Sequence, residues 1–330
     1  MFNYHQVIVF FLTIASNAYI ETKGSDVKCE NATKFCENIW YCKDDSYPDK
    51  YKACGHDGLV DRVCCDPKYK QTKSRKYCDT IHKRLTRDEY GNKEYGSTDS
   101  IPINTQSIAA LGQRNESSTK WVCAGSLISN KFVLTAAKCV NQSINIIRLG
   151  DTYLENDNDG IEHQEYGVLR HIVHPKYKYP FVYNDIALIE LNDTVRFTYF
   201  VLPLCISDGG LAYPFGEIGY NETSVVHIQV FGLNNRACDL YFEHDKFANL
   251  VPFGLDLDTQ ICASGSNYHN TCQASVGAPL QSTDLNYDYT NFLEGITVIP
   301  KPCSHTNEPG LYTRVSHYAP WIESIIFPDD

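Results

Sequence analysis

Three positions in the chain carry side chains of the types that could take part in nucleophilic catalysis: Lys138, Asp185 and Ser275, the last followed directly by Val276. A serine attacks a carbonyl when a neighbouring base takes its proton. A lysine is protonated at neutral pH at its ordinary pKa of ~10.4, so it serves as that base only when it is strongly desolvated. On chemistry alone, Ser275 and Lys138 form a candidate serine–lysine dyad, while the Val276 side chain has no atom that can attack a carbonyl.

The elements that must position these residues are mostly strands. From about Tyr95 onward, short β-rich runs alternate with Gly, Asn and Asp turn residues, which predicts an all-β barrel or sandwich. At the end of the chain, apolar residues recur at helical spacing over residues 318–326, which predicts an amphipathic helix that closes the domain. The β-rich runs are 121–123, 132–134, 144–149, 186–191, 225–230 and 295–298, and the apolar helix positions are Trp321, Ile322, Ile325 and Ile326.

The stretches around the candidate residues resemble those of chymotrypsin-like (S1) serine proteases. The resemblance implies an all-β, chymotrypsin-like double β-barrel with a C-terminal helix, covering residues 95–328. It rests on Cys123-Ala124-Gly125-Ser126-Leu127, Leu134-Thr135-Ala136-Ala137, Asn184-Asp185-Ile186-Ala187-Leu188, Leu202-Pro203-Leu204-Cys205 and Pro309-Gly310-Leu311-Tyr312-Thr313-Arg314-Val315.

In that family the Lys138 position holds a histidine and the Val276 position holds the serine nucleophile, whereas Asp185 matches the orienting acid. A working site needs nucleophile, base and acid in one geometry. The resemblance therefore implies a degenerate site without peptidase activity, in which Lys138 and Asp185 survive as a salt bridge.

The resemblance implies further losses around the cleft. Ser275 replaces an aspartate that pairs with a newly cut N-terminus, and Ala274 replaces a glycine of the same loop. Asn270 replaces the carboxylate that attracts Lys or Arg, and Pro300 replaces a glycine whose N–H pairs with an extended substrate. Because proline has no N–H, one strand-addition contact is lost.

Six of the 14 cysteines lie close together near the N-terminus. So short a segment with few aliphatic residues cannot bury enough apolar surface to fold unaided, so we expect disulfides.

Residues 28–66 resemble an arthropod clip domain in Cys54-Gly55-His56-Asp57-Gly58 and Val63-Cys64-Cys65. Zinc is disfavoured because Cys-x2-Cys pairs are absent. The resemblance implies the pairs Cys29–Cys64, Cys36–Cys54, Cys42–Cys65, Cys78–Cys205, Cys123–Cys139, Cys238–Cys262 and Cys272–Cys303.

Residues 67–94 are polar and basic, which is typical of a solvated linker and of a proteolysis site. The candidate cleavage positions are Arg84, Arg87 and Lys93. A cut after Lys93 would expose Glu94, which is a poor residue to bury.

The N-terminus predicts export of the chain. An apolar run over residues 7–14 and small residues before Tyr19 are typical of a signal peptide over residues 1–18. No other long apolar stretch is present, so we expect a secreted protein without a membrane span.

Five sequons, at Asn31, Asn115, Asn141, Asn192 and Asn221, are glycosylation candidates. The net charge of −11 argues against nucleic acid as a partner.

The acidic loop with Glu155, Asp157 and Asp159 offers oxygen ligands for calcium, although its spacing does not match an EF-hand and such turns are usually solvated. No other cofactor is expected.

The chain as a whole resembles a clip-domain serine protease homologue. This implies a non-catalytic cofactor or regulator that partners clip-domain proteases or zymogens in an extracellular cascade of innate immunity, such as melanisation or Toll-type signalling. Two alternatives stay open: an active clip-domain serine endopeptidase, and a recognition protein with no cascade role.

Overall fold

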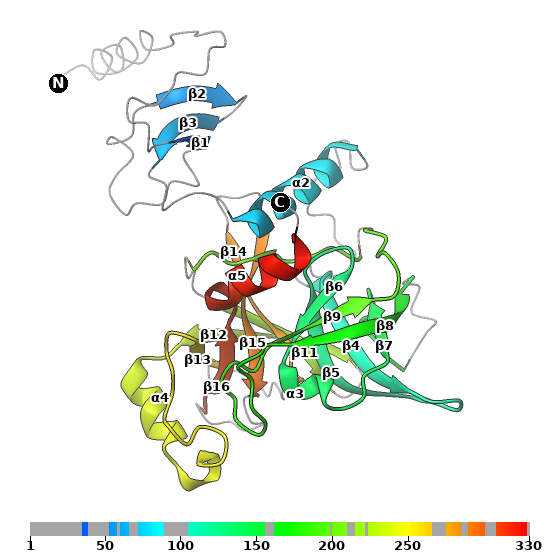
Figure 1. Cartoon of the computed structure of the whole chain (residues 1–330), viewed down its shortest axis with the longest axis vertical. Helices are drawn as coiled ribbons and strands as arrows, with labels where there is room; N and C mark the ends of the chain where they lie inside the picture. The colour runs from blue at the N-terminus through cyan, green and yellow to red at the C-terminus, as the bar shows by residue number, and fades with distance from the viewer. Residues whose placement is uncertain are drawn as a thin grey trace, which may run out of the picture. The chain divides into compact units, whose positions relative to one another are not determined.

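Strands between residues 108 and 191 close into a barrel in the order β4-β5-β6-β9-β8-β7 (Figure 1). The buried side chains of these strands supply its interior, with Leu111, Leu127, Leu134, Ile147 and Leu188 fully buried. The strands are β4 (Ile108–Arg114), β5 (Thr119–Leu127), β6 (Phe132–Thr135), β7 (Ile146–Leu149), β8 (Gln164–Val173) and β9 (Ala187–Leu191).

A second sheet has the strand order β10-β15-β14-β11-β12-β13-β16, and an added β15–β16 pairing closes it into a second barrel. Its strands are β10 (Cys205–Ile206), β11 (Phe215–Asn221), β12 (Ser224–Gly232), β13 (Gln260–Gly265), β14 (Pro279–Asp284), β15 (Thr290–Ile299) and β16 (Gly310–Arg314). The chain therefore has the expected all-β, chymotrypsin-like double-barrel fold.

This computed structural model describes residues 35–38, 53–57, 60–65, 72–88, 105–155, 162–198, 200–209, 215–221, 224–265, 275–284, 290–300 and 308–328. The chain divides into two compact units, Met1–Gln71 and Thr72–Asp330. In the first unit, β1 (Phe35–Asn38), β2 (Ala53–Asp57) and β3 (Val60–Cys65) form an antiparallel sheet in the order β1-β3-β2. The signal peptide expected over residues 1–18 and the side chains of the clip segment lie outside the described residues.

Helices complete the second unit: α3 (Ala137–Val140), α4 (Asn235–Phe242), the short 3-10 helix η5 (Asp245–Phe247) and α5 (Val315–Ile326). Helix α5 is the expected closing helix, and it begins three residues earlier than the apolar pattern. Ile322 is fully buried, and Trp321, Ile325 and Ile326 pack around it against the core. Among the described residues, the structure contains no helix that is both long and apolar enough to cross a membrane.

The linker expected over residues 67–94 is not simply a solvated tether, because its centre forms helix α2 (Lys73–Asp88). Thr72 Oγ1 accepts a hydrogen bond from the backbone N–H of Arg75 and so caps the first turn. Ser74, Cys78 and Ile81 are buried and share one helical face, at i, i+4 and i+7. The charges of this segment predicted a tether, and this buried face was not predicted from the sequence.

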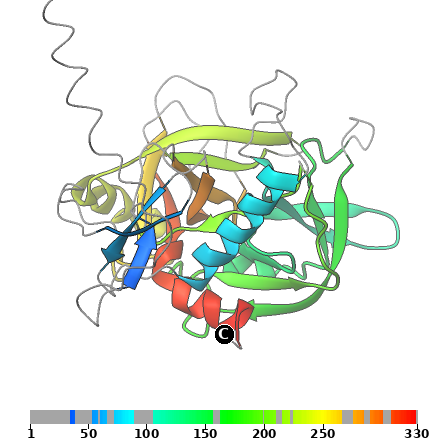
Figure 2. The ribbon, with the colours of Figure 1, turned by 90° about the horizontal axis from the view of Figure 1, so that it is seen from above.

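Helix α2 lies beside α5 in both views of the molecule (Figures 1 and 2). The Ser74 backbone N–H and hydroxyl both donate to Glu323 Oε1, at 2.8 and 2.6 Å. The Tyr77 ring contacts Phe327, with centroids 5.4 Å apart. These contacts, together with the Cys78–Cys205 disulfide, make α2 a fixed part of the second unit.

The described residues contain three disulfides, all among the expected pairs. Cys78–Cys205 joins α2 to β10, Cys123–Cys139 joins β5 to α3, and Cys238–Cys262 joins α4 to β13. The other expected pairs, Cys29–Cys64, Cys36–Cys54, Cys42–Cys65 and Cys272–Cys303, lie outside the described side chains.

Candidate active-site region

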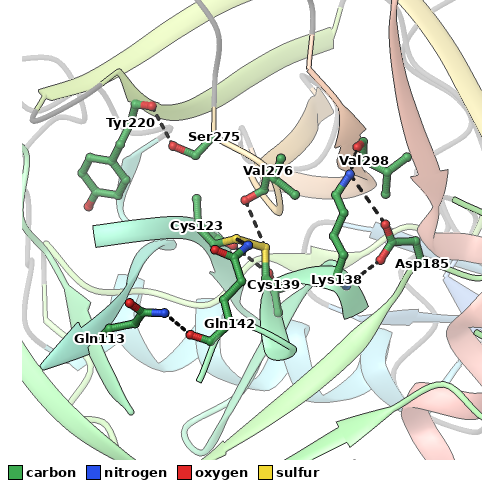
Figure 3. Close-up of a disulfide and its surroundings, with 12 residues drawn as sticks. Gln113, Cys123, Lys138, Cys139, Gln142, Asp185, Tyr220, Ser275, Val276 and Val298 are labelled. Carbon is green, nitrogen blue, oxygen red and sulfur yellow. Dashed lines mark hydrogen bonds and ion pairs between the residues drawn. A yellow bond between two sulfur atoms is a disulfide. The ribbon is translucent and has the colours of Figure 1, made fainter. Parts of the chain in front are cut away.

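Lys138 is positioned by the short turn from β6 into helix α3. Thr135, Ala136 and Ala137 before it are fully buried, and Cys139 after it is tied to β5 through Cys123. The buried small residues and the disulfide hold the backbone of α3 against the first barrel. The Lys138 side chain is consequently directed from a fixed point toward the second barrel (Figure 3).

Asp185 lies just before β9 and is fully buried. Its Oδ1 accepts a hydrogen bond of 2.9 Å from the Lys138 backbone N–H, and its Oδ2 is 3.8 Å from Lys138 Nζ. Lys138 Nζ also donates a hydrogen bond to the backbone carbonyl of Val298, at the end of β15. The lysine thus connects the two barrels (Figure 3).

Burial dominates the electrostatics of this pair. Desolvation raises the pKa of Asp185 to about 6, although the nearby charge and backbone N–H of Lys138 act to lower it. Desolvation also lowers the pKa of Lys138, and the Asp185 charge opposes that effect. Asp185 Oδ2 has no hydrogen-bond partner within the described part of the chain. Its charge is therefore balanced chiefly by the Lys138 ammonium group.

Ser275 and Val276 lie on the loop that leads into β14. The Ser275 hydroxyl donates to the backbone carbonyl of Tyr220 at 2.7 Å, on the opposite side of Val276 from Lys138 (Figure 3). The structure therefore does not bring Ser275 and Lys138 together as a dyad. The Val276 side chain packs against the hydrophobic core, and its carbonyl accepts from the Ala124 backbone N–H at 2.9 Å.

Gly277 lets this loop approach the first barrel closely. Its φ is +87°, and a Cβ atom added there would lie 2.1 Å from the Ala124 carbonyl oxygen. Its N–H donates to the Thr297 carbonyl at 2.8 Å. The turn therefore depends on glycine.

The remaining cleft positions are only partly described. Pro300 follows β15 directly, while Asn270 and Ala274 lie outside the described residues. Of the calcium candidates, Glu155 is exposed, and Asp157 and Asp159 lie outside the description. Among the described residues, no group of three or more His, Cys, Asp and Glu side chains could hold a metal ion.

Three sequon asparagines, Asn115, Asn141 and Asn192, are exposed, whereas the side chains of Asn31 and Asn221 are not described.

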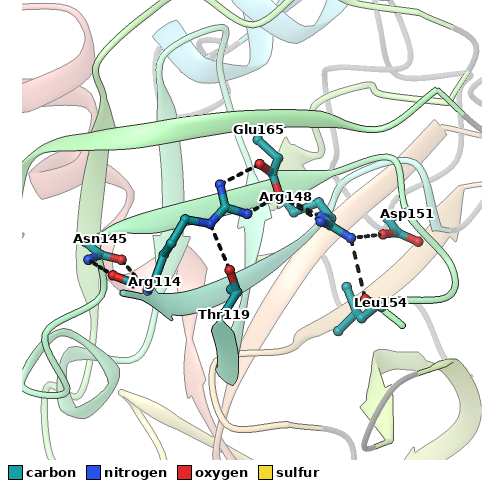
Figure 4. Close-up of polar contacts among 7 residues, drawn as sticks. All are labelled: Arg114, Thr119, Asn145, Arg148, Asp151, Leu154 and Glu165. Atoms are coloured by element: carbon teal, nitrogen blue, oxygen red, sulfur yellow. Dashed lines mark hydrogen bonds and ion pairs between the residues drawn. The ribbon is translucent and has the colours of Figure 1, made fainter. Parts of the chain in front are cut away.

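The first barrel contains a charged network that was not predicted from the sequence (Figure 4). Arg114 binds Glu165 through both terminal nitrogens, at 2.7 Å each, and the buried Arg148 binds Glu165 at 2.8 Å and Asp151 at 2.9 Å. The hydrogen bonds from Arg114, with those from Arg148, lower the pKa of Glu165 to about 2 against the effect of its burial. The four charged residues are separated in sequence at irregular spacing, so no local sequence pattern predicts that they contact one another.

A buried glutamate in the second barrel was also missed. Glu217 on β11 is fully buried and accepts hydrogen bonds from the Thr297 and Tyr312 hydroxyls, both at 3.0 Å. Only the strand register brings these three residues together. The alternation of polar and apolar residues on β11 was too weak to indicate that this carboxylate faces inward.

The two barrels, with the Lys138–Asp185 pair and Val276 between them, define a protein of the chymotrypsin-like class. The family model described as Trypsin matches residues 97–322, so the chain belongs to the trypsin family.

Curated insect proteins are similar to it over most of that range. Serine protease snk of Drosophila melanogaster is 30% identical over 67% of this chain and 54% of its own length. Phenoloxidase-activating factor 1 of Holotrichia diomphalia is 28% identical over 72% of this chain and 71% of its own length. CLIP domain-containing serine protease C9 of Anopheles gambiae is 26% identical over 88% and 82%.

The match spans only about half of Serine protease snk and 37% of Serine protease Hayan, also of Drosophila melanogaster. Among solved structures, the Drosophila Grass clip serine protease of the Toll pathway has a TM-score of 0.58 over 84% of this chain and 85% of its own. Its sequence is 21% identical, so this likeness concerns the fold alone.

Proposed function

We propose that this chain is a secreted, non-catalytic member of the trypsin family that acts as a cofactor or regulator in an extracellular proteolytic cascade. The observation that carries the proposal is the pairing of Lys138 with Asp185 beside Val276, at the positions where an active relative has histidine and serine. The fold is retained while the groups that would form an acyl-enzyme are absent.

The chemistry of these groups argues against turnover. A general base must accept a proton, but Lys138 Nζ is held between the Asp185 carboxylate and the Val298 carbonyl, and the Asp185 charge opposes the lowering of its pKa by burial. Val276 has no nucleophilic atom. Loss of the serine or the histidine alone lowers turnover by ~10⁶ in a serine protease of another fold. With both lost, we expect a rate near the uncatalysed background.

The proposed partners are clip-domain proteases or their zymogens. The names of the similar insect proteins include phenoloxidase-activating factors, which supports a role in a melanisation cascade. The Toll-type alternative rests on the family resemblance. Binding surfaces on a fold can persist when its chemistry is lost. A partner would therefore recognise the outer loops of the barrels or the clip segment proposed over residues 28–66.

Proteolysis within residues 67–94 is a further part of the proposal. Arg84 and Arg87 lie within helix α2, whose backbone has to unwind before a protease can bind it as an extended strand. Lys93 lies outside the described residues. N-terminal sequencing of the protein from its native fluid would identify the cut, and an intact linker in active material would remove this part of the proposal.

Catalysis is tested by labelling with a fluorophosphonate, together with a panel of peptide substrates. We expect no labelled band and no cleavage before or after treatment with an activating protease. An active trypsin-family enzyme, treated in parallel, is the positive control. A covalent adduct on the loop that contains Ser275 and Val276 would overturn the proposal and favour an active endopeptidase.

The cascade role is tested by cross-linking the purified chain in the body fluid of its source, followed by mass spectrometry. We expect proteases or zymogens among the cross-linked partners, and a change in the rate of zymogen activation when the chain is added back. Exclusive capture of polysaccharide or microbial surface material would favour the recognition protein instead.

A further inference from the structure

The last residues of β15 form a strand edge with an unusual feature. Strand β14 pairs with β15 as far as Ile296, and Gly277 and Ala278 continue the hydrogen bonding to Thr297. On the other side, the register with β16 shifts between Thr297 and Ile299, so Val298 has no partner residue in either register. The extra residue of such a bulge is left out of the hydrogen-bonded ladder. The Val298 carbonyl therefore needs a partner from outside the sheet.

Lys138 provides that partner. Its Nζ donates to the Val298 carbonyl, and the Asp185 carboxylate holds the ammonium group from the other side at 3.8 Å. The Lys138 side chain is 23% exposed, so most of its surface is covered in this position. A side chain from the first barrel thus occupies a backbone acceptor of the second barrel (Figure 3).

Pro300 removes the next contact along the same edge. In a strand, backbone groups two residues apart point to the same side, so Val298 and Pro300 would face one incoming strand. A peptide that adds to a sheet edge needs both carbonyl acceptors and N–H donors from that edge. Here the acceptor at Val298 is occupied and the donor at Pro300 does not exist. Lysine and proline are residues that natural proteins use to protect sheet edges.

We infer that Lys138 and Pro300 close the end of β15 against extended peptides. This strand edge is then closed to substrate-like segments, including the extended loop of a protease inhibitor, and a protein partner has to bind elsewhere on the surface. Closure of this edge affects binding rather than turnover and does not depend on the cascade role. The excluded ligand is a peptide in strand conformation.

The test measures binding of fluorescein-labelled extended peptides by fluorescence anisotropy. Four proteins are compared: wild type, Pro300→Gly, Lys138→Met with Asp185→Asn, and the combination of all three changes. Asp185→Asn accompanies Lys138→Met so that no buried charge is left without its partner. A matched peptide with N-methylated amides reports whether binding uses backbone hydrogen bonds.

We expect wild type to show no saturable binding, and the combined variant to bind the unmethylated peptide at least tenfold more tightly than the methylated one. Wild-type binding that is lost on N-methylation would overturn the inference. A folded combined variant without methylation-sensitive binding would also overturn it. Peptide cleavage by wild type would instead contradict the proposed function, so the two failures can be told apart.

A second measurement needs no variant. Acetylation of the native wild-type protein by a small amine reagent, followed by mass spectrometry, gives the relative reaction rates of its lysines. Lys176 is exposed and serves as the internal reference. We expect Lys138 to react at least tenfold more slowly than Lys176, and equal rates would show that Lys138 is not held on the β15 edge.

Discussion

Asp185 contacts the same lysine twice: its Oδ1 accepts from the Lys138 backbone N–H at 2.9 Å, and its Oδ2 faces the Lys138 ammonium group at 3.8 Å. The first contact fixes helix α3, and the second compensates a fully buried charge. An acid that would orient a histidine in an active relative is here part of a structural ion pair.

Lys138→Met should therefore destabilise the protein. It leaves the Asp185 charge buried without its partner, and breaking such a pair costs on the order of 3 kcal/mol. Chemical denaturation with urea would measure the free energy of unfolding. Adding Asp185→Asn should recover most of the loss, and a single variant as stable as wild type would show that the pair contributes little.

Asp185 should also make stability depend on pH. Because burial raises the pKa of its carboxyl to about 6, the folded protein binds more protons than the unfolded chain between about pH 4 and 6. The contribution of this group to the free energy of unfolding should thus fall as the pH rises through that window. Urea titrations at several pH values, with Asp185→Asn as the reference, give this slope. Parallel curves for the two proteins would contradict it.

Under the proposed function, a gain of nucleophilic reactivity should require changes at both Val276 and Lys138. Val276→Ser alone should remain unlabelled by a fluorophosphonate, because Lys138 in its present position cannot accept the serine proton. Val276→Ser with Lys138→His should show slow labelling, limited by Ser275 and Ala274 in the same loop. The rate of covalent labelling is the measurement, and equal rates for the single and double variants would refute this assignment of roles.

Glu165→Gln should cost on the order of 2 kcal/mol, because Glu165 joins Arg114 to the buried Arg148 through charged hydrogen bonds. Glu162→Gln is the matched control. Glu162 pairs with Arg196, and the two side chains are 81% and 66% exposed, so its loss should cost less than about 1 kcal/mol. Similar unfolding midpoints for the two variants would show that burial of the network adds nothing.

Gly277→Ala should be severely destabilising, by about 3 kcal/mol or more, because the added methyl group overlaps the Ala124 carbonyl. Gly254→Ala separates backbone strain from overlap. Its φ is +77° and nothing lies within 4 Å of the added Cβ, so it should cost only about 1 kcal/mol. Thermal unfolding of both variants gives the comparison, which fails if Gly254→Ala is the more damaging change.

The local residue pattern predicted an all-β barrel or sandwich and the chemical nature of the site, and the resemblance to chymotrypsin-like proteases indicated the double barrel. The strand runs, the closing helix and the residue types at Lys138, Asp185 and Val276 are local properties of the chain, so they can be read without coordinates. The absence of a serine hydroxyl at Val276 is independent of geometry, and so is the missing N–H of Pro300.

The directions in which the charged groups of these residues point depend on how the chain packs in three dimensions. Lys138 and Val298 are far apart in sequence, and their contact depends on how the two barrels pack and on the register shift in β15. The same holds for Ser275, whose hydroxyl binds Tyr220 instead of facing Lys138. Helix α2 is a second example. Its charge pattern suggested a tether, but Cys78 and Ile81 are buried, so the helix is docked within the second unit. Such contacts depend on three-dimensional proximity, which residue order alone does not specify.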